Sequence, residues 1–197
     1  EGALTVSIRE YYFDWTEAEP AIFTIECPDD DAGTPAARRT EITTAAQLRE
    51  GVDGIAHSLG YWNDYLLDKQ RAGVANTFAP AFAQAKGLDA ARYSFCFWDL
   101  APDEALVVEV PRPPAPYWTF QLYEMAWFEL VDIADRLSSL NHTQVPVDPD
   151  DRIRLVLSHR DPGVGSWLDA SGRRTGLLTY RAFWTTGDVP TPVARVV

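Results

Sequence analysis

The chain is poor in cysteine and histidine, the residues that most often build metal and redox sites. Its 197 residues include two cysteines and three scattered histidines. Two isolated cysteines make neither a zinc signature nor a disulfide framework, so the sequence predicts no metal site. Cys27 and Cys96 lie in apolar runs, where a free cysteine behaves as a small buried hydrophobe. A single Cys27–Cys96 bridge remains an alternative.

Positive charge is also scarce, with 17 Lys and Arg against 29 Asp and Glu and a net charge of −12. Binding to nucleic acid or to an anionic membrane surface draws on clustered Lys and Arg, so neither is an expected partner. No apolar run approaches the roughly 20 residues that span a bilayer, and no signal peptide is visible. The expected location is therefore the cytoplasm, with Glu1 in place of a starting Met.

Several catalytic motifs are missing from the chain. It contains no G-x-S-x-G elbow, no G-x-x-x-x-G-K-[ST] loop and no G-x-G-x-x-G turn. These motifs position a nucleophilic serine or cradle phosphates. The sequence therefore predicts no nucleotide cofactor, and it leaves open whether the protein is an enzyme.

Strand patterns dominate what is present. Alternating residues in 4–12 and a short apolar run in 21–27 indicate a hairpin. Later strands are expected over these ranges: 93–99, 105–110, 117–125, 153–159, 177–184 and 193–197. Short strands joined by Pro, Gly and Asp turns are typical of sandwiches. The predicted fold is mostly β, a jelly-roll-like antiparallel β-sandwich with one long helix.

The helix is predicted from an unbroken apolar stripe at helical spacing, with Thr43 or Thr44 as its N-cap. The stripe consists of Leu48, Val52, Ile55, Leu59, Trp62 and Leu66. We expect it to be buried against the sheet or against a neighbouring subunit. The predicted organisation is an extension over 1–88, made of hairpin and helix, followed by a sandwich domain over 89–197.

The C-terminal half carries an ordered set of motifs. They comprise Tyr117 to Tyr123, Ser138 to Asn141, Asp148 to Arg152, Ser158 to Gly163, Trp167-Leu168-Asp169, Gly172, Gly176 and Arg181. This pattern resembles a bacterial family of unknown function, often found C-terminal to a second uncharacterised domain. The resemblance covers about residues 90–197 and implies a jelly-roll-like sandwich that forms oligomers. Ser166 stands where the family usually has Asn before Trp-Leu-Asp.

The segment 161–172 is the main candidate site. Asp161-Pro162-Gly163 is turn chemistry, and Trp167 is a candidate pocket wall, with Ser166 and Asp169 as polar contacts beside Asp161. The structural alternative is a tight loop whose Trp167 and Leu168 close the end of the sandwich.

Three further residues are candidates, each with a structural alternative. Arg181 lies among aromatics and could clamp an anion, or it could pair internally with Asp132, Asp161 or Asp169. His159 is in phase with an apolar strand face, which favours a core-edge histidine over an acid–base role. Glu124 is either at an exposed strand end or a buried carboxylate suited to catalysis, like the candidates Asp161 and Asp169.

Two functions follow from these patterns. The first is binding of a small polar or sugar-like ligand at the loop around Trp167, with its hydrolysis left open. The second is a non-catalytic interaction module that forms homo-oligomers, because aromatic residues also concentrate at interfaces.

Overall fold

The computed structural model describes residues 8, 10, 12, 14, 16–24, 44–84, 87–125 and 128–197. The chain divides into two compact units, Glu1–Asp53 and Gly54–Val197. Residues 54–88 thus belong to the same unit as the sandwich, whereas the sequence placed a boundary at residue 88. The predicted hairpin over 4–27 lies largely outside the described residues, as does Cys27.

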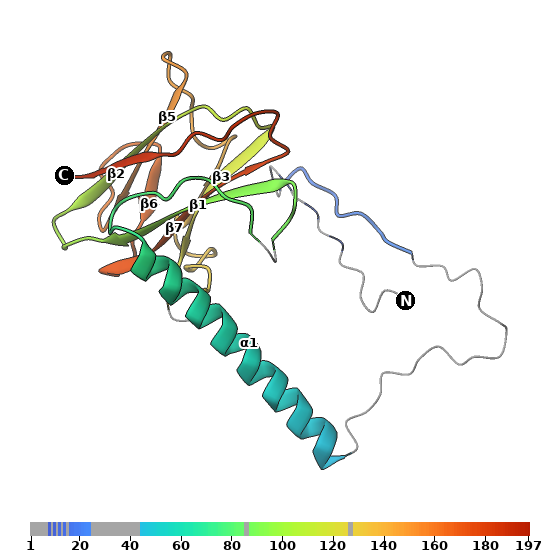
Figure 1. Cartoon of the computed structure of the whole chain (residues 1–197). Helices are drawn as coiled ribbons and strands as arrows, with labels where there is room; N and C mark the ends of the chain where they lie inside the picture. The colour runs from blue at the N-terminus through green and yellow to red at the C-terminus, as the bar shows by residue number, and fades with distance from the viewer. Residues whose placement is uncertain are drawn as a thin grey trace. The chain divides into compact units, whose positions relative to one another are not determined.

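The described residues form a mostly-β fold with one long helix, as the sequence predicted (Figure 1). Its elements are α1 (Ala45–Ala72), β1 (Ala91–Asp99), β2 (Ala105–Pro111), β3 (Tyr117–Tyr123), β4 (Ser139–Asn141), β5 (Arg152–Ser158), β6 (Trp167–Asp169), β7 (Thr175–Phe183) and β8 (Val193–Val196). No helix in the described part of the chain combines the length and apolar character needed to cross a membrane.

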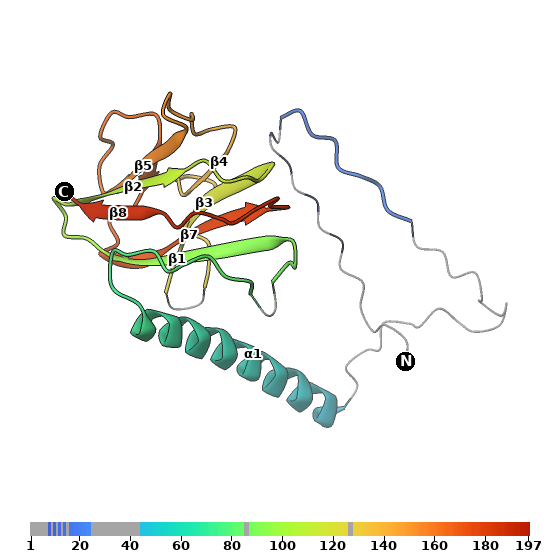
Figure 2. The same cartoon turned by 45° about the horizontal axis from the view of Figure 1, so that its top comes forward.

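The strands form two four-stranded sheets (Figure 2). Sheet A has the order β1-β7-β3-β4, and sheet B has the order β6-β5-β2-β8. Every pair is antiparallel except β5 and β6, which are parallel. Strand β7 lies between β1 and β3 and pairs with both along their full lengths. Sheet A therefore depends on β7 for its continuity.

Alternate residues of each strand point into the core between the sheets, as strand geometry requires. Strand β1 contributes Cys96 and Trp98, and the stacked rings of Phe120 and Tyr180 lie 4.9 Å apart. Sheet B supplies aliphatic side chains from β2 and β5, namely Leu106, Val108, Val110, Ile153, Leu155 and Leu157. Cys96 is free and buried, and Cys27, the other half of the alternative bridge, lies outside the described residues.

The outer face of sheet A is also buried and is lined by aromatic rings. Tyr93, Phe95 and Phe97 of β1 are 7%, 2% and 7% exposed. Phe82 packs edge-on against Phe95 with ring centroids 5.1 Å apart, and Phe128 covers Phe95 at 6.3 Å. Because both faces of β1 are covered, its sequence is apolar on both faces. Strand β1 is nevertheless the outermost strand of sheet A. In the described chain no strand pairs with its outer edge, which makes only isolated β-bridges, to Phe78 and Phe82.

Helix α1 begins with a reciprocal cap. The Gln47 amide donates to Thr44 Oγ1 and the Thr44 amide donates to Gln47 Oε1, each at 3.2 Å, which is a capping box. Thr44 is thus the N-cap.

The apolar stripe of α1 is buried only at its C-terminal end. Leu66 is 0% exposed, and Trp62 is half-buried. The other four residues are 43–63% exposed: Leu48, Val52, Ile55 and Leu59. Burial of the whole stripe against the sheet is therefore wrong, while burial against a neighbouring subunit stays a prediction.

Candidate functional site

The predicted turn at residues 161–163 forms as its chemistry indicates. The Gly163 amide donates to Asp161 Oδ1 at 2.7 Å, and Gly163 has a φ of +75°, a left-handed conformation that glycine adopts without steric cost. The Asp161 side chain is exposed to solvent. Asp161 therefore stabilises its own turn.

The neighbouring candidates also bind parts of their own loop. Asp169 is 7% exposed, and its Oδ1 accepts from the Ser171 amide at 2.6 Å while its Oδ2 accepts from Arg136 at 3.1 Å. Trp167 is half-buried, and its indole N–H points at the Ser158 carbonyl at 3.4 Å. Ser166 is buried, and its carbonyl accepts from the amide of Val156.

A cavity of about 290 Å³ lies at this end of the sandwich, but most of the predicted site residues do not line it. Its lining residues are Leu100, Pro102, His159, Arg160, Gly172 and Arg174. His159 is half-buried, with Nε2 3.4 Å from the Leu100 carbonyl oxygen. Of the predicted site residues, His159 alone lines this cavity.

Glu124 and Arg181 lie elsewhere and apart from each other. Glu124 is half-buried and accepts from Arg173 Nε at 3.0 Å. Arg181 lies on β7, paired with Tyr93 and Thr119, and forms no ion pair with a described carboxylate. The alternative of an internal pair with Asp132, Asp161 or Asp169 is therefore wrong. The structure does not gather the predicted site residues into one place.

A second, apolar cavity of about 420 Å³ opens beside the free edge of β1. Four phenylalanines line it: Phe78, Phe82, Phe95 and Phe97. The residues at the end of α1 and just after it complete the wall, with Lys69 as the charged group. The Lys69 ammonium lies 4.4 Å from the ring centroid of Phe82 and 5.7 Å from that of Tyr65, within cation–π range. The cavity thus combines an aromatic wall with one cation.

Lys69 is one of two lysines in the chain, and the sequence analysis missed it. Its signal was present, because Lys69 follows Leu66 by three positions and so continues the apolar stripe of the helix. A lysine in phase with buried residues places its stem on apolar surface and its charge at the rim.

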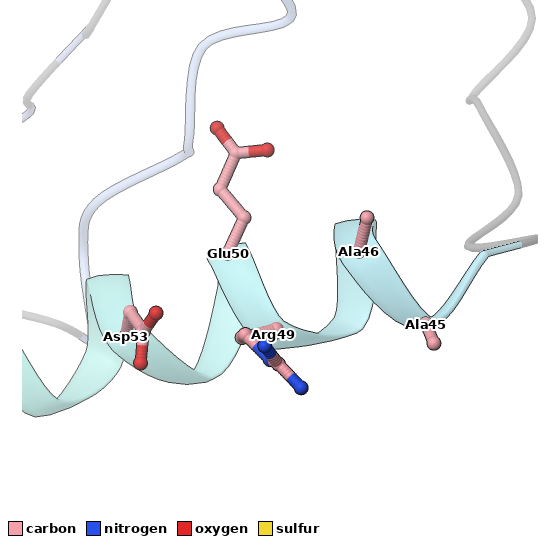
Figure 3. A pocket seen from close by; sticks show the side chains of 5 residues that line it. All are labelled: Ala45, Ala46, Arg49, Glu50 and Asp53. Atoms are coloured by element: carbon pink, nitrogen blue, oxygen red, sulfur yellow. The ribbon is translucent and has the colours of Figure 1, made fainter.

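A hollow along the first turns of α1 offers no convergent groups. It is lined by Ala45, Ala46, Arg49, Glu50 and Asp53, all exposed. Figure 3 shows the side chains of Glu50 and Arg49 pointing away from each other on opposite sides of the helix. Among the described residues, no group of three or more His, Cys, Asp and Glu side chains is placed to hold a metal ion.

No protein-family model matches the chain, and no curated protein matches it. An uncharacterised protein from Burkholderia cenocepacia has a similar structure, with a TM-score of 0.62 and 27% identity. The match covers 69% of this chain and 38% of that one, so this chain corresponds to well under half of its neighbour's length. A Vibrio parahaemolyticus protein matches with a TM-score of 0.45 and 15% identity, over 56% of this chain and 32% of that one.

Proposed function

We propose that the protein binds a small amphipathic carboxylate in the cavity between the end of α1 and the edge of β1. The observation that carries the proposal is the position of the Lys69 ammonium at the rim of a cavity walled by Phe82, Phe95 and Phe97. The volume of about 420 Å³ lies within the roughly 300–1,000 Å³ typical of small-molecule sites. An apolar body would fill the aromatic wall while the carboxylate pairs with Lys69.

The ligand is expected to be negatively charged, because the Lys69 ammonium has no described carboxylate partner. Its ammonium contacts two aromatic rings and forms no ion pair with a described carboxylate. A cation held over ring faces can still accept an anion on its open side, because cation–π attraction leaves its N–H donors available. A carboxylate would supply the missing counter-charge.

Binding is better supported than hydrolysis at this cavity. Among the described residues that line it, Thr77 carries the only polar side chain besides Lys69. Hydrolysis requires a nucleophile, or an activated water, together with a base in hydrogen-bonding reach, and these two side chains supply no such pair. We therefore propose a binding protein, and we place the ligand here instead of at the loop around Trp167.

Calorimetric titration with decanoate and with 1-decanol separates the two parts of the site. We expect Lys69→Met to weaken decanoate binding by roughly fivefold, the factor equivalent to ~1 kcal/mol for an exposed ion pair, and to leave decanol binding unchanged. Ala79→Phe places a ring at the cavity wall and should weaken both ligands.

Arg71→Met is the matched control, because Arg71 lies two residues further along α1 and pairs with Asp68 in solvent. It should bind decanoate like the wild type. Equal decanoate affinity in the wild type and in Lys69→Met would contradict the proposal, as would no binding of either ligand at millimolar concentration.

A second candidate function, self-association, is favoured by the exposed stripe of α1. Leu48, Val52, Ile55 and Leu59 are exposed in the single chain, and exposed apolar patches mark interaction surfaces. Light scattering tests it. We expect a mass that is a multiple of 22.0 kDa, and Ile55→Lys should return the mass to one chain. A wild-type monomer at micromolar concentration would contradict self-association.

A further inference from the structure

Arg181 occupies an unusual position among the arginines of the described chain. Six of them pair with carboxylates: Arg71, Arg136, Arg152, Arg154, Arg173 and Arg174. Arg92, which is half-buried, donates instead to the carbonyls of Asp89 and Ala91. Arg181 is also half-buried, yet it contacts neither a carboxylate nor a carbonyl of the described chain.

The surroundings of Arg181 are phenol rings. Its guanidinium carbon lies 5.4 Å from the ring centroid of Tyr93 and 5.3 Å from that of Tyr123. One Nη donates to the Tyr123 hydroxyl, which in turn donates to Gln121 Oε1 at 2.9 Å. The Tyr123 hydroxyl therefore acts as both a hydrogen-bond acceptor and a hydrogen-bond donor. Neither tyrosine ring neutralises the guanidinium charge.

The side chains of Tyr123 and Tyr93 are largely buried. Burial raises the pKa of the Tyr123 hydroxyl, and the adjacent Arg181 charge opposes that rise. Burial also raises the pKa of Tyr65, with smaller contributions from Tyr61 and Tyr93. With their pKa values raised, the hydroxyls of Tyr123 and Tyr65 are neutral hydrogen-bonding groups at neutral pH, so the local charge is that of Arg181.

One donor of Arg181 has no acceptor at all. Its Nε is shielded from solvent and makes no hydrogen bond. A buried N–H on a charged group is costly to leave unpaired, so the described protein satisfies this guanidinium incompletely, and an acceptor from outside can reach only its Nη hydrogens. Because the group is cationic, the acceptor that fits it best is an oxyanion.

We propose that Arg181, held between Tyr93 and Tyr123 on the outer face of sheet A, is a binding site for a carboxylate group. The carboxylate accepts from the two Nη groups, which keep free hydrogens, in the side-by-side geometry that a guanidinium offers to a planar anion; the Nε is closed to it. This site is separate from the Lys69 cavity, because Arg181 is not among its lining residues and β7 lies on the opposite side of β1 from Phe82. It does not rest on the function proposed above.

Nitrogen-15 NMR of arginine Nε–H groups tests the site directly. The probe is sodium acetate, with sodium chloride at equal ionic strength and inorganic phosphate as separate arms. We expect the Arg181 signal, identified by its loss in Arg181→Lys, to shift saturably with acetate. The Nε–H signals of Arg154 and Arg174 should stay in place, since these groups already donate to Glu109 at 2.7 Å and Asp99 at 2.9 Å.

A thermal-melting series provides the second measurement. Acetate should raise the midpoint of the wild type, and acetate affinity should fall about tenfold or more in Arg181→Lys, which keeps the charge but loses the paired Nη donors. Arg174→Lys, at an exposed arginine that donates to Asp99, is the matched control and should fold and keep acetate binding.

Four results would overturn the proposal, three of which concern acetate and chloride. These three are an Arg181 signal that does not shift, an equal shift with chloride, and equal acetate stabilisation of the wild type and Arg181→Lys. Saturation by phosphate alone would also overturn it, because the site would then recognise tetrahedral anions instead of carboxylates.

Discussion

Position 176 on β7 requires glycine, because the ring of Trp98 lies directly against its backbone. A Cβ atom at this position would lie 2.6 Å from Cζ2 of Trp98, the residue directly across on β1. Trp98 is 2% exposed and cannot move away without disturbing the core. We expect Gly176→Ala to lower the free energy of unfolding by about 1–3 kcal/mol, the usual cost of overpacking. Urea unfolding of the variant, with Gly165→Ala as the control in open space, measures it.

Cys96 is the second residue whose surroundings dictate its chemistry. Burial in the sandwich core raises the pKa of its thiol to about 12. In the unfolded chain the thiol ionises near pH ~8.5, so above that pH the unfolded state binds fewer protons than the native state and stability falls as pH rises. The slope for one thiol is at most about 1.4 kcal/mol per pH unit.

Cys96→Ala should reduce this alkaline loss of stability, measured by urea unfolding between pH 8 and 10. In a Cys27→Ser background, the remaining thiol should react with a disulfide reagent only after unfolding. Rapid labelling of the native protein would show that Cys96 is accessible.

At the scale of elements, helix α1 differs along its length. Leu66 is 0% exposed, whereas Ile55 is 63% exposed. We expect Leu66→Ala to cost about 2–5 kcal/mol as a buried large-to-small change. Ile55→Ala should change the stability of the single chain by less than about 0.5 kcal/mol. Thermal and urea unfolding at low protein concentration compare the two, and a similar large loss for both would mean that the stripe is covered in solution.

The strands that the sequence predicted are those long enough to show a pattern. Six of the eight described strands matched predicted ranges, each with at least four residues of alternation or a continuous apolar run. The two missed strands, β4 and β6, have three residues each. Periodicity cannot be read from three residues, and these strands exist because β3 and β5 offer them a hydrogen-bonding partner.

The candidate site was predicted less completely than the fold. Turn chemistry identified the Asp161–Gly163 turn, because that signal is local. The partner of Asp169 is Arg136, 33 positions away, and the wall of the Lys69 cavity comes from α1, β1 and the segment between them. Contacts between segments so far apart depend on topology, which no local pattern in this chain encodes. Arg181 was predicted as an anion-binding residue, and that remains a prediction.

At the scale of the whole molecule, the sandwich unit carries two cations on one side of sheet A, Lys69 and Arg181, that pair with no described carboxylate. Their isolation contrasts with the outer side of sheet B, where Arg154 alone contacts Glu109, Asp148 and Asp150. In a protein of net charge −12, carboxylate partners are abundant, so their absence at both places is a feature of the fold that both proposals share.

The central position of β7 has a consequence for how the chain matures during synthesis. Phe95 on β1 pairs with Thr179 on β7, about 80 positions later, and β3 also waits for β7 before it gains that neighbour. A nascent chain therefore exposes β1 and β3, with their aromatic side chains, until the residues of β7 have left the ribosome. Such delayed, long-range pairing is slow and prone to aggregation.

Chains ending at Arg174 should consequently remain as sensitive to protease as an unfolded chain, whereas chains ending at Pro192, which lack only β8, should be largely protected. Pulse proteolysis of the truncated chains after their release from the ribosome distinguishes the two lengths, and protection of the shorter chain would mean that β1 and β3 find another arrangement. If the shorter chain is unprotected and the longer one is protected, newly made copies of this protein depend on chaperones mainly in the late interval before β7 becomes available for pairing.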